Sequence, residues 1–347
     1  MFAARPLVKS FCLVPIFLMV GCSGAAGKRV VLYCAQDQEF AELILPEFTK
    51  GTQIRVDPKY DTEADKSVSL YTELVKEKAR PRCDVHWNNE ILSTIRLQRQ
   101  GLLDPYESPS AVPYPASAKA KDHTWHAFAA RARILIVNAK LVKEAERPRS
   151  LLELTEPRWK GRFAMAKPLF GTSATQAACL FEVLGPDKAK EFYRGLRDNQ
   201  VNIEPGNKQV AEGVGAGKYA AGITDTDDAM EEVSAGHPVT IVFPDRDRPK
   251  SERMGTLFIP NTVAIVRGCP NPDGARKLVD FLLSLEVEGR LAETASHQIP
   301  LNPQVKANLP KEILRPEAVK TMNVDFEKAA DLWDEAQTFL RNEFSRP

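Results

Sequence analysis

Short apolar runs and longer amphipathic stretches alternate along the first part of the chain. Residues 30–33 form an apolar run, and after a polar break Phe40, Leu43, Ile44 and Phe48 recur at helical spacing,. This pattern predicts a strand, a loop and a helix. Further strands are predicted at residues 54–56 and 84–87, and further helices at residues 70–75 and 91–97. Alternation of this kind indicates an α/β fold with a mostly parallel sheet flanked by helices.

The same alternation resumes after a loop rich in Pro, Ser and Ala at residues 104–121. A long strand within residues 125–138 is predicted to carry the chain into a second series of elements. That series comprises strands at residues 163–166, 219–223, 239–243 and 257–266, and helices at residues 175–184, 188–196 and 207–214. The chain then crosses back near residues 255–262. It ends with a helix at residues 276–283 and a long terminal helix whose apolar face runs from Val319 to Leu340,.

This order of elements predicts two lobes joined by a hinge of crossing strands. Lobe 1 comprises residues 29–127 plus 263–305, and lobe 2 comprises residues 128–262. Residues 306–347 form a helical segment that packs on the lobes. A chain of this length can bury a separate core in each of two domains.

The N-terminus carries the features of an export signal. Arg5 and Lys9 precede an apolar run at residues 11–20, which is shorter than the roughly 20 residues that a membrane-spanning helix needs,. Residues 18–22 (LMVGC) resemble a bacterial lipobox, in which Cys22 becomes the lipidated first residue. We therefore predict removal of residues 1–21, a tether at residues 22–28, and a lipid anchor that holds the protein on the periplasmic or outer side of a membrane. An ordinary secretory signal with an incidental cysteine is the alternative.

Composition and charge describe an ordinary globular protein. The chain is 43% hydrophobic and 27% charged with a formal net charge of +1, so it has no electrostatic bias toward nucleic acid,. Cys34, Cys83, Cys179 and Cys269 are too far apart for a CxxC metal or redox motif,. We expect them to be buried as small apolar residues. A Cys34–Cys83 disulfide stays open as an alternative, because both residues adjoin strand-like runs of lobe 1.

Several short fragments along the chain carry a family resemblance. They are VLY with QD at residues 31–37, CDVHW at 83–87, RAR before ILIVN at 131–138, WKGR at 159–162 and GIT at 222–224. In this order, and after a lipoprotein signal, they resemble the bacterial extracellular solute-binding proteins of the type II periplasmic fold, in particular the ferric-iron-binding branch. The resemblance implies a monomeric, two-lobed receptor that captures a small ligand and delivers it to the permease and ATPase of an ABC importer.

Polar residues follow several predicted strands at their carboxyl ends, where parallel α/β sheets form their ligand crevice. Helices that begin there direct backbone N–H groups at anions. The residues predicted to bind the ligand are Gln36, Asp37, Asn88, Asn89, Glu90, Arg131, Arg133, Thr172, Ser173, Ala174, Thr175, Asn207, Thr224, Asp225, Asp227 and Asp228. Arg131 and Arg133 would meet a carboxylate or phosphate. Closure of the lobes around the ligand is the expected switch.

The ferric-binding pattern is only partly preserved. The resemblance implies first-lobe metal ligands near Asp37 and near Asn89 or Glu90, and it sets Asp227 and Asp228 where the family has paired tyrosines. The family's anion-binding helix start matches residues 171–175, and a neighbouring asparagine matches Asn207. Carboxylates are hard oxygen donors. Asp37, Glu90, Asp227 and Asp228 could therefore hold Fe(III) or another cation as cargo, although a ligand with a cationic group would suit them equally. No obligatory cofactor is expected.

Some of these residues also have purely structural interpretations. Asp37 could be a helix N-cap. Residues 224–228 could be a capped helix start, although three aspartates exceed what one cap requires. Arg131 or Arg133 could form a salt bridge across the lobes. Trp87 could be a ligand platform, but a core position is favoured.

Other chemistries find weaker support in the sequence. The glycine-rich residues 213–218 lack the first glycine and the Ser or Thr of a phosphate-binding loop, so they predict a helix end and a turn,. The five histidines fall in no zinc-binding spacing,. Two functions besides transport stay open: an envelope hydrolase that uses Asp225, Asp227 and Asp228 as acid and base, and a sensory ligand receptor. We favour a transport receptor, which is not an enzyme, for ferric iron with an anion or for a phosphorylated or zwitterionic organic solute.

Overall fold

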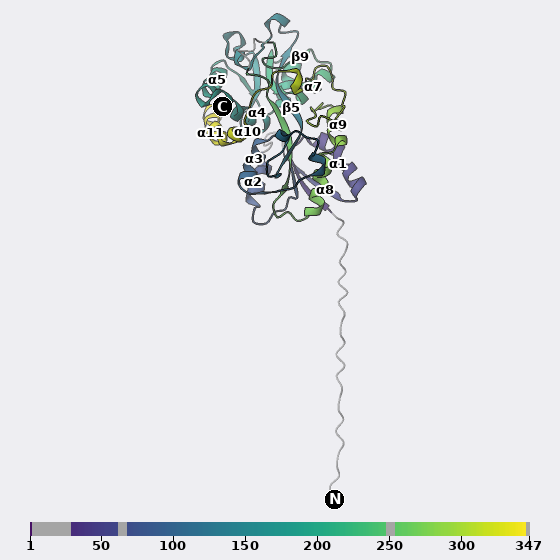
Figure 1. Ribbon diagram of the computed structural model, residues 1–347. Helices are drawn as coiled ribbons and strands as arrows, with labels where there is room; N and C mark the ends of the chain where they lie inside the picture. Colours follow the sequence, from purple (N-terminus) through teal and green to yellow (C-terminus); the bar gives the residue numbers. More distant parts are fainter. Residues whose placement is uncertain (2–28, 62–67, 248–253, 345–347) are drawn as a thin grey trace.

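The computed structural model describes Met1 and residues 29–61, 68–247 and 254–344. Figure 1 shows two lobes, with strand β5 (His126–Asn138) running from one into the other. The predicted two-lobed α/β fold is therefore confirmed. The predicted signal peptide and Cys22 lie outside the described residues.

The sheet of the first lobe is built around β1 (Arg29–Cys34). β1 pairs in parallel with β2 (Arg55–Tyr60) and with β3 (Val85–Asn88), and β10 (Phe258–Val266) lies antiparallel to β3. The short β4 (Leu103–Asp104) also pairs with β10. The helices of this lobe are α1 (Gln38–Thr52), α2 (Ser69–Lys76), α3 (Leu92–Arg99), α8 (Pro272–Leu282) and α9 (Leu285–Glu293). Figure 1 shows α1, α8 and α9 on one side of the lobe and α2 and α3 on the other.

The sheet of the second lobe has β6 (Phe163–Ala166) between β7 (Asn202–Glu204) and β8 (Ala221–Asp225), all parallel. The second half of β5 runs antiparallel to β8 and to β9 (Val239–Val242). The helices are α4 (Gly171–Leu184), α5 (Pro186–Asp198), α6 (Asn207–Gly215) and α7 (Thr226–Ser234). The glycine-rich segment ends α6 and turns at Gly217 (φ +78°), as predicted.

Strands β5 and β10 connect the lobes. They pair antiparallel, with a register shift between Pro260 and Asn261. Beside this shift Ala129 has a φ of +42°, an uncommon conformation for a residue with a Cβ,. The carboxylate of Glu288, fully buried on α9, accepts a hydrogen bond from the N–H of Ala129. The irregular point between the lobes is thus fixed by a buried charged group.

Aromatic side chains and cysteines contribute to the cores of the lobes. Trp87 is fully buried with its ring 5.5 Å from that of Phe128, so its predicted core position is confirmed. Three of the four cysteines in the described residues are buried and Cys269 is partly buried. All four are free thiols, so the Cys34–Cys83 disulfide that the sequence left open is not formed.

The C-terminal segment differs from its prediction. Instead of one helix from Val319 onward, α10 (Phe326–Asp331) and α11 (Trp333–Phe344) follow an extended stretch. The stretch is extended because Met322 and its neighbours hydrogen-bond to the backbone at Thr256, and because Asp325 caps α10 at the N–H groups of Glu327 and Lys328,. α10 packs against α3 and α4, and α11 packs against α4 and α5, so this segment contacts both lobes.

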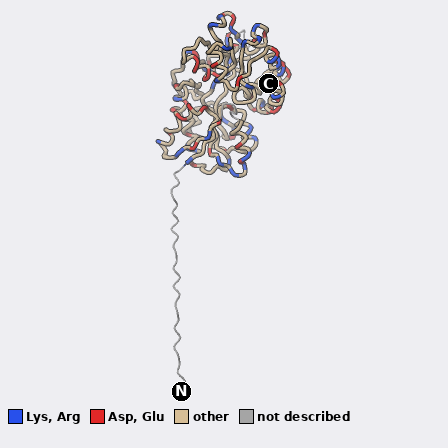
Figure 2. Tube along the Cα trace, turned by 180° about the vertical axis from the view of Figure 1, so that it is seen from behind, with Lys and Arg blue, Asp and Glu red and all other residues tan. Residues whose placement is uncertain are grey.

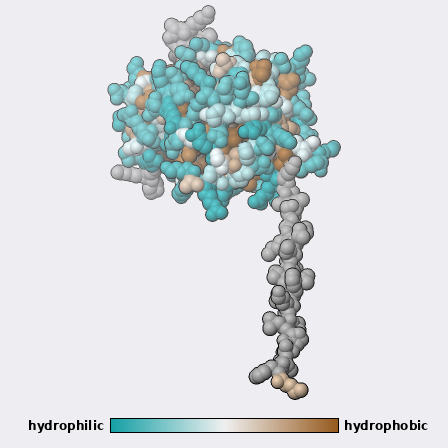
Figure 3. Space-filling model, turned by 60° about the horizontal axis from the view of Figure 1, so that its bottom comes forward, coloured by the Kyte–Doolittle hydropathy of each residue, from teal (hydrophilic) through white to brown (hydrophobic). Residues whose placement is uncertain are grey.

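The surface mixes charges of both signs. Figure 2 shows Lys and Arg interspersed with Asp and Glu over both lobes, in keeping with the small net charge. On the face shown in Figure 3, hydrophilic residues predominate and hydrophobic residues occur in small scattered groups. Among the described residues no helix is both long enough and apolar enough to span a membrane.

Candidate functional site

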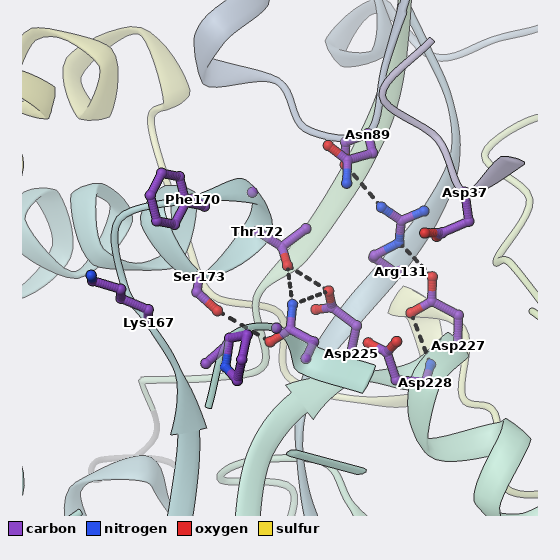
Figure 4. Close-up of a pocket in the computed structure, with 15 residues that line it drawn as sticks. Asp37, Asn89, Arg131, Lys167, Phe170, Thr172, Ser173, Asp225, Asp227 and Asp228 are labelled. Carbon is purple, nitrogen blue, oxygen red and sulfur yellow. Dashed lines mark hydrogen bonds and ion pairs between the residues drawn. The ribbon is translucent and has the colours of Figure 1, made fainter. Parts of the chain in front are cut away.

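A pocket lies between the lobes, beyond the carboxyl ends of β1, β3, β6 and β8 (Figure 4). It is lined by Asp37, Asn89, Arg131, Ala166, Lys167, Phe170, Gly171, Thr172, Ser173, Pro205, Gly206, Asn207, Asp225, Asp227 and Asp228. The open space inside it is about 20 Å³, enough for about one or two water molecules,. The lobes are therefore closed around a compact, strongly polar site.

Arg131, on β5, joins the two lobes at the centre of this pocket. Its Nε lies 2.9 Å from Oδ2 of Asp227 at the start of α7. Its other nitrogens donate to the carbonyl of Asn89 (3.0 Å) and to Oε1 of Gln36 (2.8 Å), both in the first lobe. Burial disfavours its charge, but the carboxylates of Asp227 and Asp225 outweigh this and raise the pKa of Arg131 above its usual value,. Arg131 therefore stays protonated.

Arg133, two residues further along β5, organises the second-lobe wall of the pocket. It is 1% exposed, and its Nη1 lies 2.8 Å from Oδ1 of Asp225 and 3.0 Å from Oδ1 of Asn207. The other oxygen of Asp225 accepts hydrogen bonds from Thr172 Oγ1 and from Asn207 Nδ2. Asp225 and Arg133 thus hold the first residues of two helices in place. Neither arginine forms a salt bridge across the lobes: Arg131 pairs with Asp227 and reaches the first lobe through hydrogen bonds to Asn89 and Gln36, and Arg133 pairs with Asp225.

Two helix N-termini meet at this wall. α4 begins at Gly171 and α6 begins at Asn207, and neither helix has a side-chain hydrogen bond at its N-cap. Gly171 has a φ of +50°, which glycine adopts without strain,. Uncapped helix N-termini present backbone N–H groups and a partial positive charge, which favour anions. Lys167 also lines the pocket, and Figure 4 shows its amino group directed away from Ser173 and Thr172.

Carboxylates dominate the adjoining wall of the pocket. Asp227 and Asp228 lie in the first turn of α7, and one oxygen from each of them and from Asp225 lies within 4.8 Å of the others. No other group of three or more acidic, His or Cys side chains in the described residues is arranged to hold a metal ion. Asp37 lies across from them (Figure 4). Its side chain makes no hydrogen bond as an N-cap of α1, so the capping interpretation does not hold.

Several predicted site residues lie outside the lining of the pocket. They are Gln36, Asn88, Glu90, Arg133, Ala174, Thr175 and Thr224. Glu90 is fully buried; its carboxylate accepts from the N–H of Leu92 (2.6 Å) and from Thr175 Oγ1 (2.8 Å). Glu90 therefore accepts hydrogen bonds from the first backbone N–H groups of α3 and links the first lobe to α4. Glu90 and Asp37, both predicted as metal ligands, are not part of the acidic cluster of Asp225, Asp227 and Asp228.

Sequence reasoning missed Lys167 and Phe170. Both lie between the end of β6 and the start of α4, and both line the pocket. The strand at residues 163–166 was predicted correctly. Residues that follow the carboxyl end of a parallel strand are candidates for ligand binding, and Lys167 and Phe170 are in this position. The signal was therefore present in the sequence.

Known proteins resemble this chain over most of its length. A family model described as bacterial extracellular solute-binding protein matches residues 94–328. The major ferric iron-binding protein of Neisseria meningitidis serogroup A is 25% identical over 282 residues, 80% of this chain and 82% of that protein. The putative 2-aminoethylphosphonate-binding periplasmic protein of Salmonella typhi is also 25% identical, over 293 residues that make up 81% of each chain.

Solved structures share the fold. The iron-bound HitA of Pseudomonas aeruginosa matches with a TM-score of 0.81 at 21% identity, over 91% of this chain and 99% of that one. The AfuA protein of Actinobacillus pleuropneumoniae, with fructose-6-phosphate bound, matches with a TM-score of 0.79 at 22% identity, over 92% and 99%. At this identity the likeness shows a shared type II periplasmic-binding fold. Because the family model spans more than half of its residues, the chain belongs to the bacterial extracellular solute-binding protein family.

Proposed function

We propose that this protein is the lipid-anchored solute-binding component of an ABC importer and that it captures a compact organic solute with an anionic head and a cationic group. The observation that carries the proposal is one closed pocket in which two uncapped helix N-termini lie beside a wall of carboxylates. A ligand with only one kind of charge would satisfy only one of these walls.

The anionic head would lie against α4 and α6. Their first N–H groups are the donors on that wall, and Ser173 Oγ, which donates to Asn207, lies beside them. A phosphate or phosphonate offers several acceptor oxygens for these donors. Because the open space is only about 20 Å³, the cleft would have to widen as such a ligand binds,. Relatives named for 2-aminoethylphosphonate and a structural neighbour solved with fructose-6-phosphate are consistent with a head of this kind.

The cationic group would face the aspartates. Asp37, Asp225, Asp227 and Asp228 line the pocket, whereas Arg131 and Lys167 are the cationic side chains that line it, with Arg133 directly behind. Carboxylates therefore outnumber cationic side chains. An ammonium group beside Asp37 and Asp228 would offset this excess and would bring its own hydrogen-bond donors.

Ferric iron with an anion is the second candidate, because Asp225, Asp227 and Asp228 form a cluster of hard oxygen donors,. Iron-binding relatives are consistent with it. The ion pairs of Arg131 with Asp227 and of Arg133 with Asp225 weigh against it, since two fixed positive charges adjoin the cluster and repel a trivalent cation,. We therefore rank the zwitterionic solute first.

Calorimetric titration of the purified chain with paired probes tests the proposal. 2-Aminoethylphosphonate and ethylphosphonate share the anionic head but differ in the ammonium group. The first should bind at least about tenfold more tightly, and Asp228→Asn should remove most of that advantage. Asp187→Asn, an exposed carboxylate in the first turn of α5, is the matched control and should change neither affinity.

Three outcomes would count against parts of the proposal. Equal affinity for both probes would show that the site does not recognise a cationic group on the ligand. Binding of Fe(III)–citrate in preference to either phosphonate would favour the iron candidate. Recovery of a chemically altered ligand would favour an envelope hydrolase, because the proposal requires that the ligand be released unchanged.

The anchor is tested separately from the ligand. Cys22→Ala should move the protein from the membrane fraction to the soluble fraction of the cell envelope, because a diacylated cysteine would be its attachment. Unchanged partitioning would contradict the proposed lipid anchor, but it would not bear on the proposed ligand binding. Copurification with a permease and an ATPase, rather than with a signalling partner, would support transport over sensing.

A further inference from the structure

A second chamber lies beside the pocket, between the lobes and the C-terminal helix. Its open space is about 290 Å³, and its lining includes Tyr71 of α2, Arg96 of α3, Phe170, and Trp333 and Arg341 of α11. Phe170 also lines the main pocket, so the two cavities are neighbours. The volume is close to the lower end of the range typical of small-molecule sites.

Arg96 gives this chamber a fixed cationic group. Its guanidinium carbon lies 4.7 Å from the centre of the Tyr71 ring and 5.0 Å from that of Trp333. Stacking between two aromatic rings holds the guanidinium plane in place and keeps its N–H edge available for a ligand. Its only carboxylate partner in the described part of the chain is Asp334, at 3.5 Å, and that side chain is 90% exposed. A long, solvent-exposed ion pair of this kind contributes little to stability, so an anionic ligand can readily take the place of Asp334.

Arg341 adds a second cationic group. It lies about two helical turns beyond Trp333 on α11, and its side chain is exposed at the rim of the chamber. The described lining therefore offers two guanidinium groups, that of Arg96 against two aromatic rings and that of Arg341 exposed to solvent. Planar N–H forks of this type recognise carboxylates and phosphates with two parallel hydrogen bonds.

We propose that this chamber is a second ligand site, which takes a compact organic anion with at least two negative charges. One charge pairs with Arg96 in place of Asp334, another pairs with Arg341, and the carbon skeleton lies on Phe170 and Trp333. Because α2 and α3 belong to one lobe and Phe170 to the other, the occupant contacts both lobes and stabilises their closed arrangement. The site does not depend on which ligand the main pocket holds.

Fluorescence of the full chain can report on this site. Trp333 lines the chamber, whereas Trp87, Trp125 and Trp159 do not. Citrate and 3-phosphoglycerate are the probes, and neutral glucose is the reference compound. Both anions should change the emission at millimolar concentration or below, and titration calorimetry should give the same affinity. Trp333→Phe should abolish the emission change and keep the calorimetric affinity within about twofold, since it retains an aromatic face.

Arginine variants decide whether the chamber is the site. Arg96→Gln should weaken both probes by about tenfold or more, and Arg341→Gln should weaken them by a smaller factor. Arg194→Gln is the matched control, because Arg194 also stacks on an aromatic ring, that of Phe339 at 5.2 Å, but lies outside the chamber. Each variant is checked for an unchanged far-ultraviolet circular dichroism spectrum, and Arg341→Gln keeps the test valid if Arg96→Gln does not fold.

The results also separate this site from the main pocket. Ser173→Ala should alter the affinity for 2-aminoethylphosphonate but not the emission change with citrate. The proposal is overturned if neither anion gives a signal, if both arginine variants bind like the wild type, or if Ser173→Ala abolishes the citrate response. None of these three outcomes requires that 2-aminoethylphosphonate binds.

Discussion

The guanidinium of Arg131 lies 2.9 Å from the carboxylate of Asp227, and the two side chains are only 3% and 7% exposed. One partner belongs to the strand that joins the lobes and the other to the first turn of α7. Such a pair is costly to bury but more costly to break, because the remaining partner would be a buried charge without its counterion. This relationship ties the chemistry of the pocket to the stability of the closed protein.

Single substitutions in this pair should therefore be strongly destabilising. Arg131→Gln or Asp227→Asn should each lower the free energy of unfolding by about 3–5 kcal/mol in urea titrations. The double variant should lose less than the sum of the two, because neither charge is then left alone. Arg276→Gln is the control: its partner Asp273 is 88% exposed, so we expect a change below about 1 kcal/mol,. Additive effects of the two buried substitutions would show that the pair is not coupled.

A second prediction concerns the register shift between β5 and β10, where Glu288 holds the backbone at Ala129. The Glu288 carboxylate accepts from the N–H groups of Ala129, Leu301 and Asn302 at 2.6–2.9 Å. Glu288→Ala leaves these buried donors without an acceptor, and we expect a loss of about 3 kcal/mol or more. Glu288→Gln keeps one acceptor and should lose less. Hydrogen exchange at Ala129 should accelerate in the same order.

Glu286→Ala provides the comparison for this experiment, because Glu286 is exposed on the same helix. If Glu288→Ala behaved like Glu286→Ala, the carboxylate would have no part in fixing the hinge.

Local patterns were sufficient to predict most of the fold. Strands β1, β6 and β8 are short apolar runs followed by polar residues, so their carboxyl ends, with Asp37, Thr172 and Asp225 nearby, could be identified without knowledge of the pairing partners. The terminal helix was predicted too long because its apolar spacing continues through Met322. There the backbone instead pairs with Thr256, which lies 66 residues earlier in the chain.

The interior of the site was less accessible to sequence reasoning. Arg131 and Asp227 are 96 positions apart, and nothing local to either residue indicates that they form an ion pair. Glu90 has the residue type of a metal ligand, but the start of α3 and Thr175 occupy its carboxylate. Which polar residue faces a ligand and which satisfies the backbone is decided by tertiary contacts.

A hydrogen bond between the lobes makes a third prediction. Thr175 of α4 donates to the buried carboxylate of Glu90 at 2.8 Å. Thr175→Val keeps the side-chain shape but removes the donor, and we expect a loss of about 1.5–3 kcal/mol in the free energy of unfolding. The ligand-free protein should also show a larger radius of gyration in X-ray scattering, because one link between the lobes is gone. Thr72→Val, which removes an exposed hydroxyl from α2, should do neither.

The last prediction concerns acid stability and rests on His86. This side chain lies fully buried in β3, where its Nδ1 is 3.1 Å from the carbonyl of Tyr33. Burial lowers the pKa of His86 to about 4, against 6.5 for the exposed side chain, and the bond to the carbonyl only partly offsets this. Below pH 6.5 the unfolded chain therefore takes up a proton that the folded protein does not accept.

The free energy of unfolding should accordingly fall as the pH drops from about 6.5 to about 4. The part due to His86 should reach about 3 kcal/mol, since each pKa unit is worth about 1.4 kcal/mol,. His86→Gln retains a donor for the Tyr33 carbonyl but does not titrate, so its stability should decline less steeply over this range in urea titrations at stepwise pH. His297→Gln, which replaces a partly exposed histidine, should follow the wild-type curve. Parallel curves for His86→Gln and the wild type would mean that acid sensitivity arises from other groups.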